Sequence, residues 1–185
     1  MRRRDLLPRA SSVPRVEVTR IGEGLWRWSV PRDGVELASA YLEHGDAMLL
    51  VDPVLPPPGD DLARFERAIT RDLARLGGRA WVLLTRADDP RDAEATAAMT
   101  GASRWQPGEP REPAEPSQPI PPGIEAISVG AGQVALWSPV HRALMPGRAL
   151  EVRDGALQAA PGVDAAPLLV LGAEVVIPSA GPMLP

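Results

Sequence analysis

The sequence predicts a single α/β domain in which strands and helices alternate around layered sheets. A continuously apolar strand at 48–51 is followed by an amphipathic helix at about 61–76, a second apolar strand at 80–85 and a short helix at 93–99. The flanking segments alternate apolar and polar residues, which is typical of half-buried strands. The 185 residues are enough for one domain with its own core.

Strands joined by turns fill the chain before the first helix. Residues 16–18 and 25–30 alternate apolar and polar side chains, and a third strand is expected over 35–43. The polar residues 44–46 lie between two apolar runs, a pattern that predicts a hairpin. We therefore expect most of this half of the chain to form one sheet.

The longer predicted helix has one apolar and one charged face. Spacings of three and four residues place five apolar side chains on one stripe: Leu62, Phe65, Ile69, Leu73 and Leu76. Asp60 or Asp61 can cap its N-terminus, and Gly77 and Gly78 can end it.

The shorter helix, over 93–99, marks the end of the first half. Asp89 is expected as its N-cap and Pro90 as its first residue, with Gly101 just after it. The last third then returns to strands, expected at 124–129, 133–137, 143–145, 150–152, 156–158 and 174–178, with a short helix at 164–171.

Two segments depart from this pattern. Residues 1–13 contain arginines but no apolar stretch, so we expect a disordered N-terminal tail and not a signal peptide. Residues 106–122 have a proline at every third position, the period of a polyproline II helix. We interpret them as a Pro-rich surface loop, with a ligand for an aromatic-grooved domain as the alternative. The domain is expected to span 14–185.

Composition and charge exclude several classes of function. The net charge of −4 gives no reason to expect nucleic acid or an anionic membrane as a partner. The absence of cysteine excludes disulfides, thiolate metal sites and cysteine nucleophiles. No apolar run approaches the roughly 20 residues of a membrane span. We therefore expect a cytoplasmic protein with no nucleic-acid or membrane partner, for which an unknown protein partner is one option.

Five strings of residues, in this order, resemble the metallo-β-lactamase-fold (MBL) hydrolase superfamily. They are GLWRW at 24–28, LVDP at 50–53, VGAGQVAL at 129–136, VHRALMPGRAL at 140–150 and VIPSAGP at 176–182. The resemblance implies an αββα sandwich, here shortened in its C-terminal third. It also implies the zinc-activated hydrolysis of that superfamily.

The departures from the family pattern fall on its metal ligands. In the family, a strand like that at 82–85 runs directly into the motif H-x-H-x-D-H. The positions that correspond to metal ligands here are Arg86, Asp88, Pro90, Arg91, Arg148 and Ala180. Only Asp88 could bind a metal, whereas zinc needs at least three protein ligands. The resemblance therefore implies a vacated pocket with no zinc or other cofactor and no metal-activated water.

A carboxylate cluster offers an alternative metal site. Asp88, Asp89 and Asp92 follow a buried strand and could bind a hard cation such as Mg²⁺. A metal-dependent hydrolase could use such a non-standard site. The competing interpretation is that these carboxylates cap a helix N-terminus and complement its dipole.

The arginines of the pocket offer a second alternative. If Arg86, Arg91 and Arg148 converge, they would suit a small anion better than a cation. The competing interpretation is that they form salt bridges with the neighbouring carboxylates and fill the vacated pocket. Charge alone does not distinguish the two.

No other side chains suggest catalysis. His44 and His141 are the only histidines, and both are interpreted as surface turn residues. A Ser-His-Asp triad therefore lacks an identifiable base. Asp52 is expected to anchor the backbone after its strand. The sequence thus predicts a non-catalytic member of the superfamily, a pseudoenzyme with a structural or interaction role.

Overall fold

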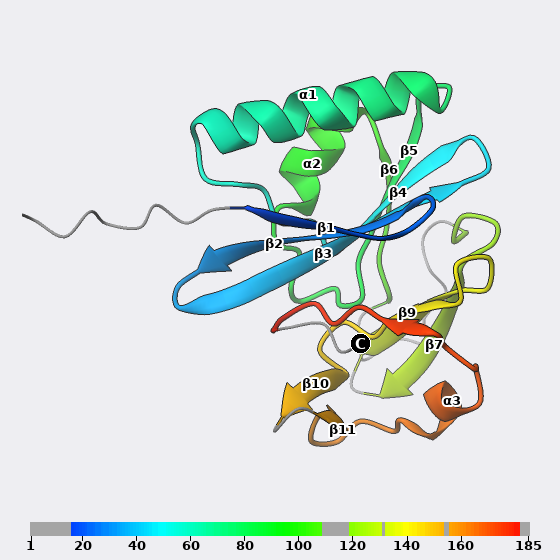
Figure 1. The fold of residues 1–185 in the computed structure, drawn as a ribbon. Coiled ribbons are helices and arrows are strands. Elements are labelled where there is room, and N and C mark those ends of the chain that lie inside the picture. The colour runs from blue at the N-terminus through cyan, green and yellow to red at the C-terminus, as the bar shows by residue number, and fades with distance from the viewer. Residues whose placement is uncertain (1–15, 109–118, 131, 154–155, 182–185) are drawn as a thin grey trace, which may run out of the picture.

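The computed structural model describes residues 16–108, 119–130, 132–153 and 156–181, and its elements form stacked layers (Figure 1). The predicted tail at 1–13 lies outside the described residues. So does the middle of the Pro-rich segment, residues 109–118.

The larger sheet is formed by β1 (Glu17–Gly22), β2 (Leu25–Arg32), β3 (Val35–His44), β4 (Ala47–Val51), β5 (Arg79–Leu83) and β6 (Ser103–Trp105). They lie in this order across the sheet. Successive strands from β1 to β4 are antiparallel to one another, whereas β5 and β6 run parallel to β4. The strands predicted here are confirmed. The three-residue β6 was not expected, since so short a segment carries no alternating pattern.

The second sheet is formed by β7 (Glu125–Gly130), β8 (Gln133–Ser138), β9 (Ala143–Met145) and β12 (Val175–Val176), in the order β12-β9-β8-β7. The remaining strands, β10 (Leu150–Arg153) and β11 (Ala156–Ala159), pair with each other. Each of these strands was predicted, although β12 is shorter than expected.

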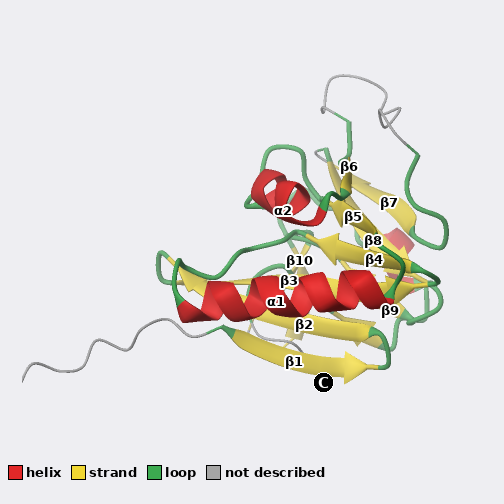
Figure 2. Cartoon of the chain, turned by 90° about the horizontal axis from the view of Figure 1, so that it is seen from above, coloured by secondary structure: helices red, strands yellow, loops and turns green. Residues whose placement is uncertain are grey.

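Helices cover the two sheets unequally. Helix α1 (Asp60–Arg75) and helix α2 (Ala93–Thr100) lie on the outer face of the larger sheet (Figures 1 and 2). On the second sheet, the helical layer is reduced to the four-residue α3 (Ala166–Leu169). The layers therefore follow the αββα order, with a thin last layer. Within the described ranges, no helix is long and apolar enough to cross a membrane.

The start of α1 differs from the prediction. Its N-cap is Gly59, and no side chain caps the helix. Asp60 and Asp61 instead lie in the first turn, where their charges complement the helix dipole. The helix ends just before Gly77 and Gly78, as predicted.

The start of α2 also needs correction. Its N-cap is Asp92 and not Asp89, so the helix begins three residues later than a cap at Asp89 requires. The amide of Ala93 donates to the Pro90 carbonyl at 2.9 Å, closing a turn before the helix. Gly101 follows the helix as its C-cap, as predicted.

Three apolar layers hold the sandwich together. Every residue of β4 is buried, and its side chains alternate between two cores. Met48 and Leu50 pack toward the helices, whereas Leu49 and Val51 pack between the sheets. A third core lies between the second sheet and Leu168 of α3. This explains why the sequence of β4 is continuously apolar.

The two histidines are less exposed than predicted. His44 is half-buried and packs so closely against Gly123 that a Cβ there would overlap its ring. The Nε2 atom of His141, also half-buried, lies 2.9 Å from the Glu43 carbonyl oxygen. The prediction of surface turn residues is therefore corrected in part: His44 ends β3 beside a turn and His141 lies in a turn, but both rings are half-buried against neighbouring segments.

The two sheets meet along one edge through backbone contacts. The amide of Val134 donates to the Thr85 carbonyl at 3.0 Å, and the amide of Ala38 donates to the Ser179 carbonyl at 2.9 Å. Gly147 packs against Thr85 in the same place, with a left-handed φ of 60°. A Cβ at Gly147 would overlap the Thr85 hydroxyl.

We expect Gly147→Ala to destabilise the protein more than the matched substitution Gly45→Ala. Gly45 has nearly the same φ, 59°, but no atom lies within 4 Å of its Cβ position. The left-handed backbone alone costs about 1–2 kcal/mol, and overpacking adds about 1–3 kcal/mol at Gly147 only. The free energy of unfolding in urea measures the difference. Equal losses would contradict this packing.

Candidate functional site

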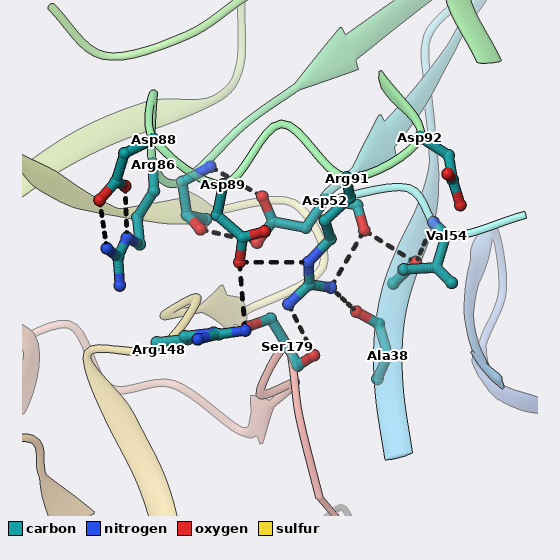
Figure 3. Close-up of polar contacts among 12 residues, drawn as sticks. Ala38, Asp52, Val54, Arg86, Asp88, Asp89, Arg91, Asp92, Arg148 and Ser179 are labelled. Atoms are coloured by element: carbon teal, nitrogen blue, oxygen red, sulfur yellow. Dashed lines mark hydrogen bonds and ion pairs between the residues drawn. The ribbon is translucent and has the colours of Figure 1, made fainter. Parts of the chain in front are cut away.

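The candidate site lies where the loop after β5 crosses the edge of the sandwich (Figure 3). This loop, residues 86–92, supplies two arginines and the aspartates of the predicted cluster. Arg148 comes from the turn before β10, and Ser179 from the segment after β12. The structure therefore gathers residues from both sheets at the place where the resemblance implies metal ligands.

Asp52 holds the two central strands in register. Its side chain is buried, and its backbone adopts a left-handed φ of 46°. One carboxylate oxygen accepts from the Thr85 amide at 2.9 Å, and the other accepts from the Thr85 hydroxyl at 2.6 Å. Burial raises the pKa of Asp52, and the nearby charge of Arg91 opposes that rise. Asp52 thus anchors the backbone, as predicted.

The guanidinium of Arg91 lies at the centre of the site. Its side chain is only 3 % exposed. It donates to the carbonyls of Ala38 and Ser179 at 2.9 and 3.0 Å, and to that of Asp52 at 3.3 Å. Its Nε lies 3.6 Å from the Asp89 carboxylate. One cation therefore joins β3, the end of β4 and the C-terminal segment.

The other two arginines form more exposed ion pairs. Arg86 binds Asp88 through two bonds, the shorter of which is 2.5 Å, and this contact lowers the pKa of Asp88. Nη2 of Arg148 lies 3.4 Å from the Asp89 carboxylate. Each arginine of the predicted anion site is thus already next to a carboxylate.

The predicted carboxylate cluster does not converge. Asp92 points away from Asp88 and Asp89 (Figure 3). Its carboxylate accepts from the Leu55 amide and from Arg32, each at 2.7 Å. Among the residues that the structure describes, no group of three or more His, Asp or Glu could hold a metal ion. Asp92 does occupy the N-cap of α2, where its charge complements the helix dipole, but its side chain makes no capping hydrogen bond.

The remaining vacated positions contribute backbone. Pro90 is exposed, and its carbonyl closes the turn before α2. Ala180 forms an isolated β-bridge with Leu37. Sequence reasoning missed the carbonyls of Ala38 and Ser179 as the main partners of Arg91. No residue type signals a backbone acceptor, because every residue carries one.

The chemistry of the site follows from these contacts. Three guanidinium groups, of Arg86, Arg91 and Arg148, face three carboxyl groups, of Asp52, Asp88 and Asp89. A guanidinium does not give up its proton near neutral pH and offers no lone pair to a metal. Through Arg91 and Arg148, the set therefore links the loop after β5 to the other segments of the site.

We expect Arg91→Met to lower the free energy of unfolding by about 3 kcal/mol or more, because removing one partner leaves buried polar groups uncompensated. The matched control is Arg148→Met, which removes the other guanidinium next to Asp89. That side chain is 47 % exposed, so its loss should cost about 1 kcal/mol or less. Urea unfolding measures both. Similar losses for the two variants would refute the central role of Arg91.

Comparisons with known proteins identify the fold of the chain but not a family within that fold. No protein-family model matches the sequence, and no curated protein matches it. Solved structures do match. The DIM-1 metallo-β-lactamase exposed to ceftazidime has a TM-score of 0.66 at 17 % identity, covering 92 % of this chain and 91 % of its own.

Two further enzymes give similar values. The mono-zinc form of the metallo-β-lactamase FIM-1 from Pseudomonas aeruginosa has a TM-score of 0.60 at 19 % identity, with 91 % of this chain and 89 % of that chain covered. A metallo-β-lactamase from Hirschia baltica has a TM-score of 0.59 at 16 % identity, with 91 % of this chain and 92 % of that chain covered. Identities this low show the fold alone. The resemblance seen in the sequence is confirmed at that level: the chain has the metallo-β-lactamase fold, with arginines at positions where the resemblance implies metal ligands.

Proposed function

We propose that this protein is a non-catalytic member of the metallo-β-lactamase-fold hydrolases, with a structural or interaction role and no cofactor. The observation that carries the proposal is the buried guanidinium of Arg91, which bonds three carbonyls and lies next to Asp89. A fixed positive charge at this point repels the divalent cation that hydrolysis in this fold requires.

The donor set does not fit zinc. A zinc site needs at least three ligands of nitrogen, sulfur or carboxylate type. Here the two available carboxylates, of Asp88 and Asp89, already pair with arginines. A metal at either carboxylate would have to displace a guanidinium and lie beside the remaining ones. We therefore derive no hydrolytic step through a metal.

A carboxylate-metal hydrolase is disfavoured by the same contacts. It would need Asp92 to leave Arg32 and the Leu55 amide and to turn toward Asp88 and Asp89. The proposed role is therefore structural, or one of interaction with a partner. The expected partner is a protein, since the net charge of −4 gives no attraction to nucleic acid or to an anionic membrane.

We expect protein purified without chelators or metal-binding tags to contain less than about a tenth of an equivalent of any transition metal. Added Zn²⁺, Mn²⁺ or Mg²⁺ should leave the melting temperature unchanged, because a ligand that binds only the folded state would raise it. Elemental mass spectrometry and thermal unfolding measure the two quantities.

A pair of variants distinguishes a specific site from surface binding. Asp88 and Asp46 are similarly exposed, and each pairs with one arginine. Near-stoichiometric metal that is lost in Asp88→Asn but kept in Asp46→Asn would contradict the proposal. Hydrolysis of a chromogenic β-lactam that depends on added zinc and disappears with a chelator would contradict it as well.

A further inference from the structure

One cavity in the described part of the chain lies away from the Arg91 site. It measures about 750 Å³ and lies between α1 and strands β1, β2 and β3 of the larger sheet. Figure 2 shows α1 crossing this face of the sheet. The volume falls within the range of about 300–1,000 Å³ that is typical of small-molecule sites.

Aromatic side chains form the floor of this cavity. Trp28 and Tyr41 are buried, whereas Trp26 and Phe65 are half-buried and keep ring surface exposed. Trp26 meets Tyr41 edge to face with ring centroids 5.0 Å apart, and Trp28 lies 5.3 Å from Phe65. The Trp28 indole donates to the Val54 carbonyl at 2.7 Å, which fixes its ring. The floor is therefore preformed.

Three of the four arginines that line the cavity pair with carboxylates: Arg64 with Asp61, Arg71 with Asp72 and Arg75 with Glu43. The Tyr41 hydroxyl also donates to Glu43, at 3.1 Å. Arg20, in contrast, has no carboxylate within ion-pair distance in the described part of the chain, and its Nε donates only to the Gly22 carbonyl, at 3.3 Å. Its guanidinium lies over the Trp26 ring, 5.9 Å from the centroid.

We propose that this cavity binds a small planar aromatic anion, with its rings against Trp26 and Phe65 and its acid group on Arg20. Stacking on aromatic faces favours planar rings. The guanidinium above Trp26, which pairs with no carboxylate among the described residues, favours a negatively charged group on the same molecule. The proposal concerns a different face from the Arg91 cross-link, so it goes beyond the proposed non-catalytic role and does not depend on it.

The full-length protein can be tested with 1-anilinonaphthalene-8-sulfonate, a planar aromatic sulfonate. We expect one molecule to bind per chain below the melting transition, with energy transfer from tryptophan. Ala68→Trp fills the cavity, since Ala68 lines it, and should weaken binding about tenfold or more. Ala74→Trp is the control, because Ala74 is exposed on α1 and does not line the cavity. No binding, or equal binding by both variants, would overturn the proposal.

The role of charge is tested with an uncharged analogue, N-phenyl-1-naphthylamine. Arg20→Gln should weaken binding of the sulfonate about threefold, the size of one partly exposed ion pair, and leave the uncharged analogue unaffected. Arg67→Gln is the matched control, since Arg67 is exposed on α1 and does not line the cavity. Equal losses for the charged and uncharged probes would overturn the assignment of the acid group to Arg20.

Discussion

The buried guanidinium of Arg91 is the contact on which the candidate site depends. Two sheets of a sandwich must be joined at their open edge, and the carbonyls of Ala38 and Ser179 meet there. In a metal-dependent member of this fold, a bound cation would neutralise the carboxylates at this edge. Here the guanidinium of Arg91 supplies the positive charge, and no metal ion is needed for that purpose. Because the guanidinium belongs to the chain, this contact does not depend on the concentration of a metal ion in solution.

The buried Asp52 and the loop that carries Arg91 stabilise each other. Asp52 is enclosed by both sheets, and burial raises its pKa, while the charge of Arg91 favours its ionised form. Asp52 in turn fixes the amide and hydroxyl of Thr85, at the start of the loop that carries Arg91. Arg91 has a left-handed φ of 46°, a conformation that a non-glycine residue adopts only when its contacts hold it. The loop geometry and the ion pairs therefore support each other.

Most of the fold could be predicted from the sequence, whereas the site geometry could not. The strands follow from alternation and from apolar runs such as β4, because these patterns report burial directly. The cap of α1 was missed because Gly59 leaves no side-chain signal, and β6 because three residues have no period. The direction of Asp92 depends on Arg32 and Leu55, which are distant in sequence. The bonds of Arg91 end on carbonyls, which every residue possesses.

Anomalous diffraction at the zinc absorption edge, from crystals grown with excess ZnCl₂, tests the central claim most directly. The account predicts the Arg91 guanidinium between the carbonyls of Ala38 and Ser179, with no anomalous peak near Asp88 or Asp89. A zinc peak bonded to Asp88 or Asp89, with Arg91 displaced from the two carbonyls, would contradict it. That result would support a metal-dependent hydrolase instead of a non-catalytic protein.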